Sequence, residues 1–544
     1  MTAIIKNGLK VNSAKSFLKT FSDTTSNHYL FVGKSLPWAN DLSPDVPVDT
    51  QKSESKVWDE MIGLKKIIEG DVSLVVPRSN WKSGTLYFAY DDSDEDLLYH
   101  PTSDDSSAFP DQSLGKFYVI NSTGDLFICI DNAENSASSI EPSKPSTVTN
   151  LTTTTDGYVW KYITTVQFGS NKFVTDNWIP IKTLSAEDES DQWDVQTAAT
   201  PGQLLRVVVT DVAASTAFSY AHEGTLEVIE SPANAVKITT SGEFPWDEDG
   251  YAGYQLRVTS EDGSVEEVFD VVSNEASGGN KYVTVSSSIS SVDFSGDSTY
   301  KLLPKITITS NGDSESPIDV IPTLNVDNKI QSFTIVSGGE GASSVTIAVV
   351  APTGVNSFVS PTIRCVLDSF RGLGKDPEKD LGASFVMVAT KIKYDEEGND
   401  FTKSNDYRQI GIIKGVYNGA NLASDSTLRP TKKLTVAFID GAEFNADSEL
   451  TLLNSDESEI GHIRVLDFDS ATNQLTFIQT EDTGYTSPAV GNIIDDGSGT
   501  KANITSISSS EVTKLKGDIL YLENRRPVIR AEGQTEEIKT IIEF

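Results

Sequence analysis

The chain has 544 residues, of which 38% are hydrophobic and 9% aromatic, and its 79 acidic and 43 basic residues give a formal net charge of −36. A chain of this length exceeds one ordinary core, so we expect about two to four domains, and its apolar content argues against global disorder. No apolar run approaches the roughly 18 residues of a membrane span, so we expect no membrane insertion. The N-terminus lacks the charged start and apolar stretch of a signal peptide, so we also expect no Sec export.

The excess of acidic residues excludes one class of function and leaves two interpretations. Such a surface repels phosphate backbones, which argues against nucleic-acid binding as a main task. The simpler interpretation of the charge is solubility. The alternative is that it complements basic faces on partner proteins, which would raise the rate of association.

Helical patterns are scarce in this sequence. Apolar residues recur at helical spacing from Ala14 to Phe21, with Asn12 or Ser13 as a plausible cap, which predicts a helix over 13–21. A second short helix is predicted over 55–63, where Trp58, Met61 and Ile62 would be buried. Nearly everything else is typical of short strands between Gly, Asn, Asp and Ser turns. Strands are predicted at residues 29–32, 85–90, 117–120, 126–130, 158–164, 204–209, 385–389 and 434–438.

The acidic run between Asp91 and Asp111 holds no Lys or Arg, so we expect it to form a solvated loop. From Thr200-Pro-Gly202 onward the composition becomes rich in Ser and Gly, with evenly spaced short strands.

The predicted fold is mainly β: a multilayer β-sandwich core with two short helices and inserted small β-sandwich or barrel modules. Insertions in loops are tolerated because the entropy of loop closure rises slowly with length. The predicted parts are the N-terminal part of the core (1–200), inserted β modules (201–360), a return to the core (361–420), a second inserted β module (421–512) and the last core strands (513–544).

The C-terminal segment predicts two strands joined by a polar turn. In the second strand Ile538, Thr540, Ile542 and Phe544 share one face. Chain ends usually fray unless something holds them, so an apolar aromatic at this position suggests a strand that is paired into a sheet.

This segment, Tyr521-Leu-Glu523-Asn524-Arg525-Arg526-Pro527 followed by Gln534-Thr535-Glu536-Glu537-Ile538, resembles the C-terminus of the baseplate wedge proteins of T4-like contractile-tailed bacteriophages. The resemblance recurs in chain order at Val32-Gly33-Lys34-Ser35-Leu36-Pro37-Trp38. Further matching segments are Trp58 with Met61, 76–81, 156–162 and Tyr407-Arg408-Gln409-Ile410.

The resemblance covers roughly residues 13–182, 365–415 and 513–544, and residues from about 200 to 360 and 420 to 512 have no counterpart in the phage T4 member. It implies an all-β structural subunit of the virion tail baseplate that is assembled in the host cytoplasm. It also implies a homodimer that bridges other wedge proteins, and the inserts are candidates for contacting tail-fibre proteins.

Motifs for catalysis and for cofactors are missing. Gly33-Lys34-Ser35 resembles the end of a P-loop, but His28 stands where the first glycine is required. The four histidines are scattered singly, and the two cysteines, Cys129 and Cys365, lie in apolar runs that favour buried thiols. The acidic segments 247–250 and 395–398 are typical of hairpin turns, with calcium binding as the alternative. We therefore expect no enzyme activity, no cofactor and no metal.

The candidate interface residues are large aromatic and arginine side chains in the segments of the resemblance, because these types are enriched at interfaces. Trp38 follows a proline in a polar loop and could be an exposed anchor, or it could belong to the core. Arginines next to Pro527 could pair with carboxylates across a subunit contact, or could lie in a solvated turn. The predicted interface residues are Trp38, Arg78, Trp81, Arg525 and Arg526.

The sequence leaves two alternative functions. A tail-associated adhesin with glycan-binding β modules would need clustered exposed aromatic residues and a trimeric assembly. A carbohydrate-cleaving enzyme would need two carboxylates about 5–10 Å apart in a groove. Nothing in the sequence favours the second.

Overall fold

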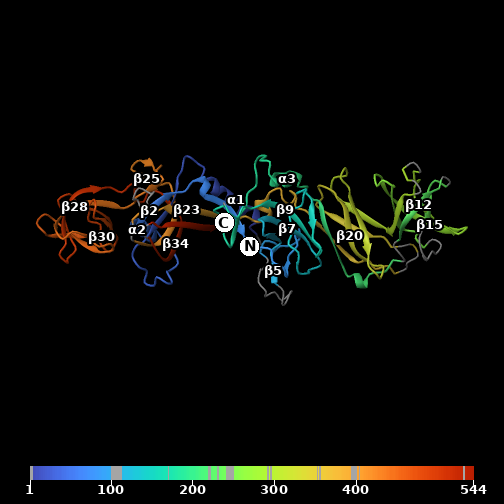
Figure 1. The fold of residues 1–544 in the computed structure, drawn as a ribbon, viewed down its shortest axis with the longest axis horizontal. Helices are drawn as coiled ribbons and strands as arrows, with labels where there is room; N and C mark the ends of the chain where they lie inside the picture. Colours follow the sequence, from blue (N-terminus) through green and yellow to red (C-terminus); the bar gives the residue numbers. More distant parts are fainter. Residues whose placement is uncertain are drawn as a thin grey trace. The chain divides into compact units, whose positions relative to one another are not determined.

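The computed structural model describes most of the chain and divides it into two compact units (Figure 1). Unit 1 comprises residues 1–77, 169–182 and 382–544, and unit 2 comprises residues 78–168 and 183–381. The residues described are 4–99, 113–169, 171–218, 222–229, 232–239, 250–290, 293–294, 297–351, 353, 357–393, 401–402, 405–530 and 533–544.

These units divide the chain differently from the domain boundaries expected for the core. Residues 1–200 do not form one part, because most of 78–168 pairs into its own sheet within unit 2. Residues 361–420 are divided as well, since β22 (Thr362–Leu367) pairs with β11 (Leu204–Thr210) in unit 2. The mainly β fold with inserted modules is confirmed, and both inserts contain a closed barrel.

The first sheet of unit 1 has five strands in the order β27-β2-β1-β24-β34. Its strands are β27 (Thr427–Leu428), β2 (Met61–Lys66), β1 (His28–Gly33), β24 (Asp406–Lys414) and β34 (Asp518–Ile529). The second sheet has the order β10-β3-β23-β35. Its strands are β10 (Trp178–Pro180), β3 (Val72–Pro77), β23 (Phe385–Lys393) and β35 (Thr535–Glu543).

The C-terminal strands behave as their sequence predicts, and each completes a different sheet. β35 pairs with β23 along its whole length, and the Phe544 amide donates to the Ser384 carbonyl oxygen at 3.1 Å. The Phe544 ring lies 5.3 Å from that of Phe17 in α1 (Asn7–Lys19). β34 pairs instead with β24, so the last two strands do not form a hairpin with each other.

Strand β1 is buried on both faces because its alternate side chains enter two different cores. Leu30 and Val32 pack with residues of the second sheet, including Ile538. Tyr29 and Phe31 pack instead with Trp58 of α2 (Gln51–Glu60), which covers the outer face of the first sheet.

The helices differ from their predicted bounds and number. Helix α1 begins at Asn7, and Ser13 lies inside it, bonded back to the Leu9 carbonyl, rather than acting as the cap. Helix α2 is capped by Thr50, and β2 begins at Met61. The sequence missed α3 (Asp191–Ala198) and the single turn α4 (Pro377–Asp380), because few of their residues are apolar.

Unit 1 also contains the second inserted module, a closed barrel in the order β28-β31-β30-β29-β32-β33. Its core includes Leu434, Ile463, Phe477 and Ile494. Its strands are β28 (Lys432–Asp440), β29 (Glu449–Leu453), β30 (Glu459–Asp469), β31 (Gln474–Ile478), β32 (Ile493–Asp495) and β33 (Lys501–Ser508), and the short pair β25 (Tyr417–Asn418) with β26 (Asn421–Leu422) precedes it.

Unit 2 begins with a sheet in the order β6-β7-β9-β8, whose core is aromatic. Tyr158 and Trp160 stack with ring centroids 5.2 Å apart, and Cys129 is fully buried beside them, as its apolar run predicts. Cys365 is only half-buried. The strands here are β4 (Thr85–Tyr87), β5 (Ser113–Gly115), β6 (Tyr118–Ile120), β7 (Asp125–Asn132), β8 (Leu151–Thr153) and β9 (Tyr158–Thr165).

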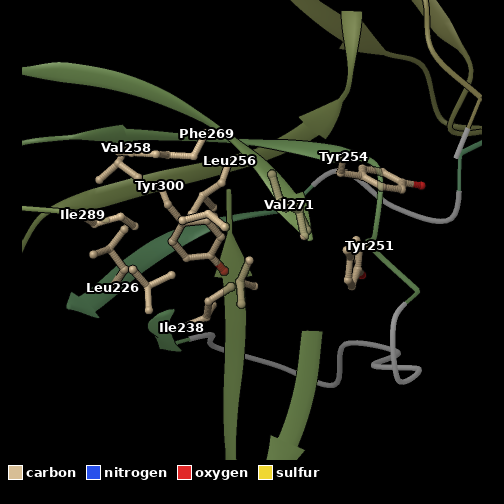
Figure 2. Close-up of a cluster of buried hydrophobic side chains, with 14 of the residues drawn as sticks. Leu226, Ile238, Tyr251, Tyr254, Leu256, Val258, Phe269, Val271, Ile289 and Tyr300 are labelled. Carbon is tan, nitrogen blue, oxygen red and sulfur yellow. The ribbon is translucent and has the colours of Figure 1, made fainter. Parts of the chain in front are cut away.

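The first insert holds a closed barrel in the order β12-β13-β16-β15-β14-β17 (Figure 2). Leu226, Leu256 and Tyr300 fill its interior. Its strands are β12 (His222–Val228), β13 (Ala235–Thr239), β14 (Tyr254–Thr259), β15 (Glu266–Ser277), β16 (Asn280–Val285) and β17 (Thr299–Pro304), and the adjoining ribbons are β18 (Ile306–Ser310) with β21 (Val345–Val349), and β19 (Ile318–Leu324) with β20 (Ile330–Gly338).

Asp91, the first residue of the acidic run, is not solvated as predicted. Asp91 is mostly buried because Arg364 bonds both of its carboxylate oxygens, with the shorter contact at 2.5 Å, and Arg206 lies 3.8 Å away. The arginines are remote in sequence, so the local charge pattern could not reveal them. Residues 100–112 of the same run lie outside the described residues.

A buried ion pair lies where the chain passes from β34 to β35. Arg530 Nε donates to Glu536 Oε1 at 3.1 Å, and each side chain is 5% exposed. Truncating one partner leaves an uncompensated buried charge, so Glu536→Leu should lower the free energy of unfolding by about 3 kcal/mol. The double variant Arg530→Met/Glu536→Leu should regain most of that loss in denaturant titrations. Equal losses in the single and double variants would contradict this explanation.

Asp380 should make the stability of unit 2 depend on pH. Burial raises its pKa to about 7, although the Gly374 amide donates to Oδ2 at 2.8 Å. The folded protein therefore holds a proton that the unfolded chain releases near pH 4, so the stabilisation is complete below that pH and is lost as the pH rises through 7. Asp380→Asn removes this loss.

The stability of Asp380→Asn relative to the native chain should consequently increase by roughly 1–2 kcal/mol between about pH 5.5 and pH 8. Urea titrations at both values measure this, and the lower one stays above the isoelectric point of about 4.4. A difference that does not change with pH would show that Asp380 does not bind the extra proton.

Candidate functional site: the clamp loop and strand β34

Three segments that carry the resemblance meet in the first sheet of unit 1. β1, β24 and β34 are neighbours, with Val32 paired to Ile410, and Gln409 paired to both Gly33 and Asn524. The Gln409 side chain also donates to the Asn524 side chain at 2.7 Å. Segments separated by hundreds of residues in the sequence therefore form neighbouring strands of one sheet.

The chain between β1 and α2, residues 34–49, is named here the clamp loop, and Arg408 of β24 holds its first half. Arg408 is 5% exposed and binds both carboxylate oxygens of Asp41 at 3.0 Å. It also donates to the Ser35 carbonyl and to Asp406. The hydrogen bond from Arg408 lowers the pKa of Asp41, so this contact persists into the acid range.

Trp38 connects the clamp loop to β34. Its indole N–H donates to the Arg525 carbonyl at 3.1 Å, its backbone amide donates to Asp41 at 2.7 Å, and the Lys34 ammonium lies 4.5 Å from the ring centroid. The side chain is half-buried. Trp38 is thus a fixed part of the surface rather than a freely projecting anchor.

The two arginines of β34 have different environments. Arg526 is exposed and donates through Nε to the Leu42 carbonyl at 3.0 Å, so it also holds the clamp loop. Arg525 is half-buried, and no hydrogen bond or ion pair joins its guanidinium to the residues that the structure describes. Asn524 adds a bond to the Asp45 carbonyl at 2.9 Å.

The clamp loop presents apolar side chains to solvent. Leu42 is 73% exposed, Val46 83% and Val48 62%. Polar bonds to the sheet fix the backbone that carries them, so the apolar groups are held outward. Exposed apolar side chains on a fixed loop, next to the exposed Arg526 that binds the Leu42 carbonyl, are typical of a protein–protein contact.

The other two predicted residues lie in unit 2. Arg78 donates to Asn80 at 2.8 Å and lies 4.7 Å from the Phe168 ring centroid, and Trp81 donates to the Ser138 hydroxyl at 3.1 Å. Both are half-buried and packed within their own module. Their role in an interface stays a prediction.

Sequence reasoning missed Arg408 and Asp41 as organising residues. The only signal was the position of Arg408 within the segment Tyr407-Arg408-Gln409-Ile410. Its partner lies 367 residues away, so no local spacing could connect them.

The sequence predicts no metal site, with calcium at two acidic turns as the alternative. Among the described residues, no group of three or more His, Cys, Asp or Glu side chains could hold a metal ion. The acidic turns at 247–249 and 395–398, considered for calcium, lie outside those residues. Within the same described set, no helix is long and apolar enough to cross a membrane.

No family model matches the chain, and no curated protein matches it.

The role of Arg408 is testable through exchange of backbone amides with deuterium. Arg408→Ala removes the bonds that fix the clamp loop, so amides in residues 36–49 should exchange at least about tenfold faster. A matched control is Arg464→Ala, which removes an arginine bonded to Glu449 on the barrel. Unchanged exchange at 36–49 in the Arg408 variant, or equal acceleration in both variants, would contradict this role.

Proposed function

We propose that this chain is a structural subunit of a phage tail baseplate wedge, which forms a homodimer and bridges neighbouring wedge proteins in the virion. The observation that carries the proposal is the convergence of three of the resembling segments. Residues 32–38, 407–410 and 521–527 were matched separately along the sequence, and they lie on adjacent strands and a loop bonded to them. An unrelated protein with chance matches would have no reason to bring them together.

The surface made by the clamp loop and β34 suits such a role. It combines exposed Leu42 and Val46 with the arginines 525 and 526 on a backbone that is fixed in advance. A preorganised surface loses less conformational entropy when a partner binds, which favours stable assembly. No cofactor or enzymatic step is part of the proposal.

In this proposal the two inserts, residues 201–360 and 421–512, bind partners outside the framework that carries the resemblance. Tail-fibre proteins are the candidate partners. Each barrel has its own core, and closure leaves few unpaired strand edges. Arg257 of β14, 6% exposed, joins the first barrel to β19 through both carboxylate oxygens of Asp319 at 2.5 and 2.6 Å. The barrel is therefore held to its neighbouring ribbons rather than hanging from a linker.

The adhesin alternative gains no specific support. It requires clustered exposed aromatic residues on the inserts. Among the described residues of 201–360 no aromatic side chain is strongly exposed, and in 421–512 only Tyr485 is.

The oligomeric state tests the proposal. Light scattering during gel filtration should give twice the chain mass of 58.9 kDa. Arg525→Glu/Arg526→Glu should weaken the dimer at least about tenfold, since it places negative charge at the contact. The control Lys237→Glu/Lys301→Glu makes the same charge change on the first barrel and should leave the dimer intact. A monomer would contradict the homodimer, and a trimer would favour the adhesin.

A further inference from the structure

β34 is an edge strand, and part of its outer edge is open. It pairs with β24 on one side and is the last strand of its sheet. Residues 524–526 are covered by bonds to the clamp loop. No hydrogen bond joins the outer edge of residues 518–522 to any residue that the structure describes. Unpaired N–H and C=O groups of this kind are a template for another strand.

A groove of about 290 Å³ runs along the open part. One wall is β34 at residues 519–522, and the other is 47–50 with the first turns of α2. The pairing of β34 with β24 shifts register here and leaves Leu520 without a partner, which interrupts the regular alternation of side chains and lets residues 519–522 all line the groove. The clamp loop, which supplies residues 47–49 of the other wall, is also bonded to β34 at 524–526. A peptide in this groove would lie beside the free backbone groups.

The lining of the groove combines aliphatic and acidic side chains. Val48, Val57 and Leu520 supply aliphatic surface, and Asp49 and Glu54 are the charged residues of its lining. None of the described residues that line it is Lys or Arg. The basic residues of α2 face elsewhere, where Lys52 and Lys56 pair with Glu481 of the second barrel.

The acidic residues of the groove determine which kind of protein segment can bind there. A second copy pairing through residues 518–522 would bring Asp49, Glu54 and Asp518 of each copy together, and like charges at a contact disfavour it. A basic segment of a different protein gains from the same charges.

We propose that residues 518–522 of β34 receive an extended segment of another protein, which adds as a further strand and alternates aliphatic with basic side chains. Backbone bonds to the open edge supply affinity, as in other cases of strand addition. Aliphatic side chains enter the groove between Val48 and Leu520, and lysine or arginine side chains reach Asp49 and Glu54. Only the identification of the segment as part of a neighbouring wedge protein rests on the proposed function.

A fluorescently labelled eight-residue peptide of alternating valine and lysine is a suitable probe with the full chain. Fluorescence anisotropy should report saturable binding, with a Kd below about 1 mM. Asp49→Lys/Glu54→Lys should weaken binding at least about tenfold. Glu443→Lys/Asp482→Lys makes the same charge change at exposed positions of the second barrel and should alter binding less than about twofold.

The role of the backbone is tested with two methylated peptides, one carrying N-methyl groups on every valine and one on every lysine. Methylation removes the donors on one edge of the peptide and keeps its charge. One of the two should therefore bind at least about tenfold more weakly than the parent. Equal binding of all three peptides, equal effects of the two charge variants, or no binding at about 1 mM would each overturn the proposal.

The outcomes also separate this inference from the proposed function. A chain that binds the peptide at residues 518–522 but remains a monomer would contradict the homodimer and leave the edge site standing. A dimer that does not bind the peptide would contradict the edge site and leave the homodimer standing.

Discussion

The pairing of β34 and β35 with two consecutive strands, β24 and β23, is the constraint on which unit 1 depends. Each C-terminal strand completes one of the two sheets, so the sandwich lacks an edge strand on both layers until residues 518–543 are in place. Phe385 pairs with Glu543, and Lys414 pairs with Asp518, across long stretches of intervening chain. Contacts this distant in sequence are slow to form, because loop closure must occur before they give any stabilisation.

The second barrel occupies that intervening chain, and its connection explains why the sandwich tolerates it. Arg429 and Glu511 lie where the chain enters and leaves the barrel, and they exchange two hydrogen bonds, from the Arg429 amide to the Glu511 carboxylate and from the Glu511 amide to the Arg429 carbonyl. The Arg429 guanidinium also binds the Thr431 and Ser509 carbonyls. Because the two ends of the barrel are held together, the segment between β24 and β34 behaves as a shorter loop. The entropy lost when these two strands pair is therefore smaller.

The sequence was most informative where the determinant is local. Short strand-forming runs between turn residues located the strands at 29–32, 158–164 and 385–389. Alternation of side chains in the last strand identified the inward face of Ile538. Helix α3 was missed because of its eight residues only Val195 and Gln196 are buried, which leaves no apolar stripe.

The candidate site was predictable in its residue types and not in its geometry. Trp38, Arg525 and Arg526 were identified from the resemblance and from the enrichment of aromatic and arginine residues at interfaces. The sequence could not show that the Trp38 indole binds the Arg525 carbonyl, 487 residues away, or that Arg408 and Asp41 fix the loop. Those contacts follow from the order of the strands, which depends on non-local pairing.

The way in which the edge of β34 is covered has a mechanical consequence. Hydrogen bonds from side chains, and not a ladder of backbone bonds, hold the clamp loop to β34. The Asn524 and Arg526 side chains donate to backbone carbonyls of the loop, and the Trp38 indole of the loop donates to the Arg525 carbonyl between them. Each such bond contributes on the order of 1 kcal/mol, so they can be exchanged one at a time. The Arg408–Asp41 pair anchors the base of the loop separately. A partner could therefore reshape the outer half of the loop while both sheets of the sandwich keep all their strands, which suits a subunit whose neighbours rearrange around a rigid frame.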